Sequence, residues 1–117
     1  MVLAPRPSSF LPKSIYMQKY TVTYDDGKIK QSAEFPAPDR LPSQGDVYEF
    51  VTTIYTLGNV CYDVGDTLEI IGRTTEAPHH RTSSLGNLHV RGKYCISIWT
   101  NIELAIASGW LKLVASA

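Results

Sequence analysis

The sequence predicts a mainly β protein: a small, strongly bent barrel with one short helix just before its last strand. Three observations lead to this prediction. Short stretches rich in β-branched and aromatic residues follow one another along the chain. Tight-turn sequences containing glycine separate these stretches. A single helix-capping pattern stands just before the last apolar stretch.

Size and composition fit one domain. A chain of 117 residues that is 44% hydrophobic and 19% charged can bury a core without disulfides or a metal ion. No apolar run approaches the roughly 18 residues of a membrane span, and the N-terminus lacks the pattern of a signal peptide. A formal net charge of zero argues against a protein whose whole surface binds nucleic acid. We therefore expect an intracellular protein, or a virion part made inside a cell, without membrane association.

The first element is an extended arm over residues 1–14. Three prolines within the first twelve residues prevent a helix, because proline fixes φ and removes an amide donor. Such an arm is either disordered or bound along a partner. In the second case Phe10 and Leu11 are the expected anchors.

Residues 15–45 are expected to form an antiparallel hairpin followed by a linker. β-forming residues recur at even spacing before the Asp-Asp-Gly sequence at 25–27, which supplies the positive-φ positions of a tight turn. The proline-rich stretch that follows would separate this hairpin from a main barrel over residues 46–117.

Residues 46–57 fit two structures. Asp46 and Glu49 have the spacing of a capping box, and apolar side chains fall on one helical face. However, residues 51–56 are mostly β-branched, and such side chains lose χ1 freedom in a helix. We therefore expect a strand, followed by turns at glycine that lead into two further strands.

A polar loop is predicted over residues 73–86, and loops of this length are usually functional or mobile. Short strands are expected at 88–91 and 94–99, with a last strand at 110–114.

The one helix is expected to begin at a capping box formed by Thr100 and Glu103 and to end before Gly109. Trp99 and Ile102 would fill the core. Asn101, in the first turn, has the best claim to an outward role.

Cys61 and Cys95 both stand among hydrophobic residues. Without a secretion signal, we expect two buried thiols. A disulfide between them, or a reactive or metal-binding thiol, is the alternative.

Two resemblances refine these expectations. Residues 62–70 (Tyr-Asp-Val-Gly-Asp-Thr-Leu-Glu-Ile) resemble the strand-entry motif of SH3-like barrels, in which a Gly-Asp turn opens a strand of alternating core residues. Residues 97–103, with Ile106, Gly109 and Leu111 after them, resemble the C-terminal ends of short, uncharacterised proteins of tailed bacteriophages. This second resemblance covers residues 58–114 and implies a phage-encoded protein of the host cytoplasm or the virion.

No enzymatic signature is present. The chain contains neither a nucleophile elbow nor a glycine-rich phosphate loop. The adjacent histidines His79 and His80 lack a familiar metal-ligand spacing, and Asp63, Asp66 and Glu69 fit turn and strand positions. We expect no catalytic residues, no metal and no cofactor.

Charge is unevenly distributed along the chain. Residues 46–69 carry only acidic charges, whereas residues 70–93 are mainly basic and contain all three histidines. If the long loop packs beside the strand at 88–91, one basic patch would gather five side chains: His79, His80, Arg81, His89 and Arg91. A solvated loop with scattered charges is the alternative.

Three functions follow, in order of preference. The first is a non-enzymatic protein-binding module, either a virion component bound to a neighbouring virion subunit or a small inhibitor of a host factor, with homo-oligomers also open. The second is a nucleic-acid-binding SH3- or KOW-like barrel that uses the basic loop at 73–91. Only one aromatic residue, Tyr94, lies near that loop for base stacking, which weakens this function. The third is an enzyme or small-ligand binder.

Overall fold

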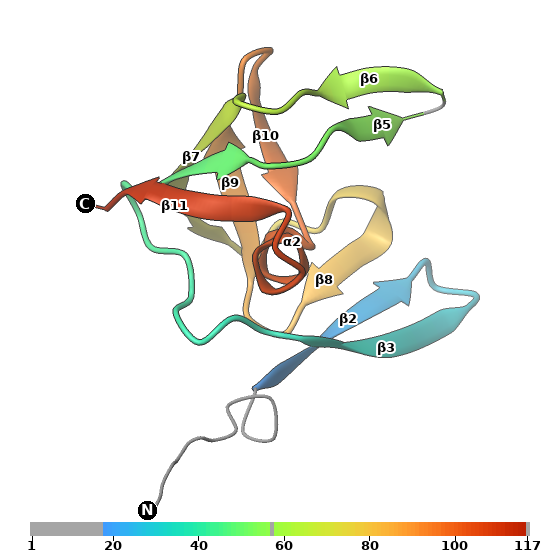
Figure 1. Cartoon of the computed structure of the whole chain (residues 1–117). Coiled ribbons are helices and arrows are strands. Elements are labelled where there is room, and N and C mark those ends of the chain that lie inside the picture. Colours follow the sequence, from blue (N-terminus) through green and yellow to red (C-terminus); the bar gives the residue numbers. More distant parts are fainter. Residues whose placement is uncertain (1–17, 57, 117) are drawn as a thin grey trace, which may run out of the picture.

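The computed structural model describes residues 18–56 and 58–116 (Figure 1). The predicted arm, with its anchors Phe10 and Leu11, lies outside the described residues. Within them the chain is mainly β, and its α-helix, α2 (Ile102–Ala107), comes just before the last strand. The predicted fold class is therefore confirmed.

The largest sheet has five antiparallel strands in the order β10-β9-β7-β4-β11. Within this sheet, β4 lies between β7 and β11, and β7, β9 and β10 follow one another as a meander. The strands are β4 (Val47–Phe50), β7 (Thr67–Thr74), β9 (Asn87–Arg91), β10 (Ile96–Trp99) and β11 (Leu111–Ala115).

Alternation along these strands builds the main core, since successive side chains point to opposite faces of a sheet. In β7, for example, Leu68 and Ile70 are buried, whereas Thr67 is exposed and Glu69 is only half-buried. The buried members of this core are Tyr48, Phe50, Tyr62, Leu68, Ile70, Leu88, Val90, Ile102 and Leu111.

A short ribbon extends from the five-stranded sheet. It consists of β5 (Ile54–Thr56) and β6 (Asn59–Tyr62), which pair with each other. The strand predicted in residues 46–57 is thus confirmed as β4 and β5. Asp46 caps no helix there: its buried carboxylate accepts hydrogen bonds from the Arg40 guanidinium, the shorter at 2.8 Å.

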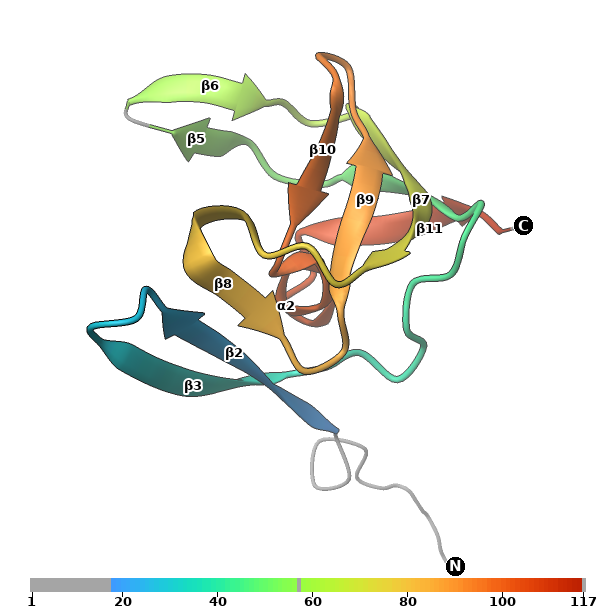
Figure 2. The ribbon, with the colours of Figure 1, turned by 180° about the vertical axis from the view of Figure 1, so that it is seen from behind.

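The predicted hairpin forms, but it is not a detached appendage. Strands β2 (Lys19–Asp25) and β3 (Lys30–Pro36) join at the expected turn, where Gly27 has a φ of 88°. A third strand, β8 (Arg81–Ser83), pairs with β2, so a three-stranded sheet lies beside the barrel (Figure 2).

The prediction of a plain loop over residues 73–86 is therefore wrong. This stretch contains β8 and, before it, the 3₁₀ turn η2 (Pro78–His80). Pairing with β2 satisfies the backbone of β8. The side-chain amide of Asn87 also donates hydrogen bonds to the carbonyl oxygens of Glu76 and Arg81, at 2.7 and 3.0 Å.

Helix α2 lies between the two sheets and contributes to both cores (Figure 2). Ile102 belongs to the main core, while Leu104 packs against the smaller core around Tyr20 and Val22. The helix thereby connects the barrel to the hairpin.

The predicted capping box of α2 is wrong. The cap residue is Asn101, and its side chain makes no capping hydrogen bond. Glu103 is only 1% exposed and pairs instead with the guanidinium of Arg73, at 2.8 Å. A carboxylate buried this deeply needs a charged partner, so Glu103 serves the ion pair rather than the cap.

The end of α2 follows the prediction. Gly109 has a φ of 81°, its amide donates to the Ile106 carbonyl, and the Trp110 amide donates to the Ala105 carbonyl at 2.9 Å. These two hydrogen bonds define a Schellman motif.

Both cysteines are free, and the prediction that they are buried is wrong. Cys95 is exposed in the turn between β9 and β10, and Cys61 is half-buried on the β5–β6 ribbon. No helix among residues 18–56 and 58–116 has the length and apolar character needed to cross a membrane.

Candidate functional site

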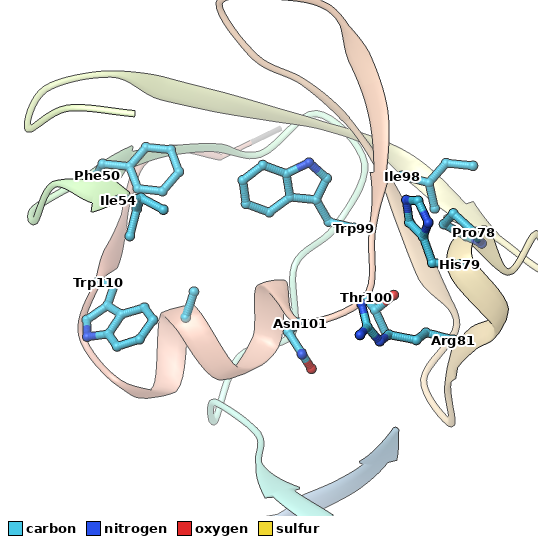
Figure 3. A pocket seen from close by; sticks show the side chains of 11 residues that line it. Phe50, Ile54, Pro78, His79, Arg81, Ile98, Trp99, Thr100, Asn101 and Trp110 are labelled. Atoms are coloured by element: carbon cyan, nitrogen blue, oxygen red, sulfur yellow. The ribbon is translucent and has the colours of Figure 1, made fainter. Parts of the chain in front are cut away.

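A pocket of about 350 Å³ opens where the base of the β5–β6 ribbon, η2, β8, β10 and α2 meet (Figure 3). We call it the aromatic pocket. Its main apolar lining consists of Phe50, Ile54, Pro78, Ile98, Trp99 and Trp110. The elements that form it are far apart in the sequence, so only the folded chain brings these side chains together.

Trp99 forms the inner wall of this pocket. Its indole nitrogen donates a hydrogen bond to the Ser97 hydroxyl at 2.8 Å, and its ring meets Tyr62 edge-on with centroids 5.6 Å apart. The ring also lies 6.4 Å from that of Phe50. Trp99 is thus half-buried between core and pocket, whereas Ile102 is fully buried as predicted.

Trp110 forms the rim and is 47% exposed. Its backbone is fixed on both sides, because its amide belongs to the Schellman motif and its carbonyl accepts from the Val51 amide at 2.9 Å. A large apolar side chain is therefore held in solvent on a rigid backbone. Partly exposed tryptophan in such a position is typical of binding sites.

Arg81 brings a positive charge to the pocket. Its side chain extends from β8 toward Thr100 (Figure 3). Within the part of the chain that the structure describes, its guanidinium forms neither an ion pair nor a hydrogen bond.

Asn101 adds a fixed amide beside Arg81. Its side-chain oxygen accepts a hydrogen bond from the Tyr20 hydroxyl at 3.1 Å. Burial raises the pKa of Tyr20 to about 12, with Glu103 adding to the shift, so the hydroxyl keeps the proton that it donates. The amide nitrogen of Asn101 makes no hydrogen bond within the described residues and is available to a ligand.

The two adjacent histidines have an unusual backbone. His79 and His80 both have positive φ values, 57° and 62°. This conformation is uncommon for residues other than glycine and often marks functional sites. It directs His79 into the pocket lining, while the His80 ring meets Tyr24 edge-on at 6.0 Å.

A second hollow, of about 760 Å³, adjoins the aromatic pocket over the three-stranded sheet. We call it the hairpin hollow. Val22, Tyr24, Gln31 and Phe35 line it, and it shares Arg81 and Asn101 with the aromatic pocket.

The structure brings together three of the eight side chains that the sequence singled out. His79, Arg81 and Asn101 line the aromatic pocket. Phe10 and Leu11 lie outside the described residues. His80 lies beside this group, against Tyr24.

The expected basic patch does not extend to strand β9. Arg91 forms an ion pair with Glu69 at 2.8 Å, and that carboxylate comes from the neighbouring strand β7. His89 is half-buried opposite Ile98 and lines neither hollow. The loop packs against the hairpin instead of lying along β9, which explains why the five side chains do not converge.

Trp110 is a site residue that its sequence context does not indicate, because it begins the last apolar stretch of the chain. One clue in the sequence is that its two tryptophans stand on either side of α2, the α-helix of the described residues. Gly109, just after the C-terminal end of α2, has a positive φ and turns the chain sharply. The side chain of Trp110 therefore points away from the core.

The chemistry of the aromatic pocket follows from its lining. The walls are mainly apolar, and polar groups at one side supply a cation, a histidine and an amide donor. The described residues include no group of three or more His, Cys, Asp or Glu side chains placed to hold a metal ion. Comparisons with family models, with curated proteins and with solved structures found no match to this chain.

Proposed function

We propose that the protein is a non-enzymatic protein-binding module, and that the aromatic pocket receives a large apolar side chain of its partner. One observation carries this proposal: Trp110 stands exposed on a rigid backbone at the rim of an apolar pocket. Such pockets, lined by tryptophan and flanked by a few polar groups, are typical of interaction hot spots.

The pocket is large enough to matter energetically. An aromatic side chain buries about 150–250 Å², which corresponds to about 4–6 kcal/mol at about 25 cal/mol per Å². Part of this gain is offset by the entropy lost on association. A single inserted side chain would therefore anchor a moderately tight complex.

Nucleic-acid binding is the second candidate, because Trp110 and Arg81 together could stack on a base and contact a phosphate. The other cations near the barrel argue against nucleic-acid binding, because carboxylates already neutralise two of them. Arg91 pairs with Glu69, and Lys93 pairs with Asp66 at 2.6 Å. On the barrel strands and β8 this leaves Arg81 and Lys112 without an ion pair among the described residues, whereas binding along a nucleic-acid backbone neutralises several phosphates.

The resemblance to tailed-phage proteins suggests where to look for the partner. A host factor or a neighbouring virion subunit stays a prediction from that resemblance. We therefore propose affinity capture from bacterial lysate with the tagged full chain, with and without nuclease, read by mass spectrometry.

Two variants make this experiment specific. Trp110→Ala should abolish capture of the partner, whereas the matched control Tyr94→Ala should retain it. Tyr94 is also an exposed aromatic residue, but it lines neither hollow. Capture that nuclease removes would favour the nucleic-acid function, and capture that survives Trp110→Ala would contradict the proposed site.

A further inference from the structure

The aromatic pocket and the hairpin hollow meet at two shared residues, Arg81 and Asn101. The two hollows therefore border each other at these two side chains, and we call them together the groove: it comprises the aromatic pocket with Trp110 and the hairpin hollow over the three-stranded sheet. At their junction the groove presents an arginine side chain from β8 and an amide from the start of α2.

We propose that this groove binds an extended acidic-apolar peptide segment of the partner. A large apolar side chain enters the aromatic pocket, and a carboxylate beside it pairs with Arg81. This inference rests on the proposed function and adds to it the charge of the partner segment.

Charge supports this choice of occupant. None of the residues that line the two hollows is acidic. Four arginines lie in the described part of the chain, and three of them, Arg40, Arg73 and Arg91, have carboxylate partners. Arg81 is the exception, so its partner must come from outside this part of the chain or from solvent.

The geometry of Arg81 suits a carboxylate. A guanidinium presents a planar fork of donors that matches the two oxygens of a carboxylate. The free amide nitrogen of Asn101 lies on the same lining and can donate to the same group. Because Arg81 lines the same pocket that receives the apolar anchor, the acidic residue is expected close to that anchor in the sequence of the segment.

The chain's own N-terminus is a less suitable occupant. Residues 1–17 contain Arg6 and Lys13 but no acidic residue. Placed in the groove, they would add positive charge beside Arg81 and His79. Electrostatics therefore favours a foreign acidic segment over this one.

The test uses an array of nine-residue peptides on a Gly-Ser background. Each carries Trp, Phe or Leu at the centre and Glu, Gln or Lys at one position up to four residues away. The full chain is applied to the array, and the affinities of selected fluorescein-labelled peptides are measured by fluorescence anisotropy. We expect Glu peptides to bind about five- to tenfold more tightly than Gln peptides.

Matched variants assign this preference to Arg81. Arg81→Gln should remove the preference for Glu while leaving the contribution of the apolar anchor, and Arg81→Lys should retain part of it. Lys112→Gln should change nothing, because Lys112 is exposed on β11 and lines neither hollow. Thermal melts of each variant show whether it is folded.

The outcomes separate this inference from the proposed function. Binding that depends on the anchor and on Trp110 but not on Glu would overturn the inference and leave the proposed function standing. Failure of every peptide to bind would contradict both. If the Phe10→Ala variant binds all peptides more tightly, the N-terminus is the occupant of the groove. If oligothymidine displaces the labelled peptides more effectively than unlabelled Glu peptides do, the occupant is a nucleic acid. Either result overturns the inference.

Discussion

The hydroxyl of Tyr20 accepts a hydrogen bond from the backbone amide of Leu104, at 3.1 Å. Leu104 lies in the first turn of α2, where amides have no partner within the helix. The same hydroxyl donates to Asn101, the cap residue whose own side chain makes no capping bond. A tyrosine of the hairpin thus caps the helix from outside and fixes a residue of the groove.

Replacing Tyr20 by phenylalanine should lower the free energy of unfolding by about 1–3 kcal/mol at pH 7, because the part-buried amide of Leu104 loses its acceptor. Urea denaturation measures the change. The control is Tyr24→Phe, whose hydroxyl makes an exposed hydrogen bond to Asp26; this variant should lose less.

The effect of Tyr20→Phe should depend on pH. The pKa of Tyr20 rises from 10.0 to about 12 on folding, so the folded state holds its proton longer than the unfolded state. The contribution of this pKa shift to the free energy of unfolding is fully present below about pH 10. It falls by about 2–3 kcal/mol as the pH rises toward 12. The variant lacks this loss, so the difference should narrow above pH 10. Burial also raises the pKa of Tyr48 and Tyr62, and their contributions persist in both proteins.

Removing the charged partner of Glu103 should be strongly destabilising. Arg73→Met leaves a carboxylate that is 1% exposed without its ion pair, and this typically costs about 3–5 kcal/mol. Adding Glu103→Gln removes the buried charge and should restore part of the loss. The control Arg91→Met breaks an exposed pair with Glu69 and should cost at most about 1 kcal/mol. A small effect of Arg73→Met would contradict this account.

Gly92→Ala should destabilise the barrel by about 1–3 kcal/mol. A Cβ at this position would overlap the hydroxyl oxygen of Tyr62 and lie 3.2 Å from a methyl carbon of Leu68. Combining it with Tyr62→Phe should restore about 1 kcal/mol or more in a double-mutant cycle. Gly72→Ala is the matched control, since a Cβ there meets nothing within 4 Å. Equal losses at both glycines would rule out the steric cause.

The backbone at His80 predicts a clear order among substitutions. His80 has a φ of 62°. The His80→Val variant should therefore have a free energy of unfolding lower by about 1–2 kcal/mol, because a β-branched residue is disfavoured in the left-handed region. His80→Asn and His80→Gly should have little effect or stabilise slightly. Thermal melts of the three variants provide the comparison, and a valine variant as stable as the glycine variant would refute the strain.

Local patterns predicted the elements whose cause is local. The turn at 25–27, the strands at 47–50 and 54–56, and the helix end at Gly109 follow from glycine conformation and β-branched side chains. These features depend on neighbours only a few residues away.

The features that sequence reasoning missed depend on distant partners. β8 is short and polar, and it becomes a strand because β2 offers a free edge. Glu103 matches a capping box in sequence, but its partner Arg73 stands 30 positions earlier. The groove likewise combines residues from the ribbon, the 3₁₀ turn and the helix, which no short window of sequence contains.

The pairing of β2 with β8 also bears on how the chain folds. Thr21 and Ser84, which are hydrogen-bonded beside this pairing, are 63 positions apart, and contacts at such separation form slowly. During synthesis the hairpin leaves the ribosome before β8 and α2 do. The β2 edge that later pairs with β8 stays uncovered during this interval. An uncovered strand edge is prone to pair with other chains. Translation speed between the hairpin and β8 therefore sets how long each new chain is exposed to misassembly.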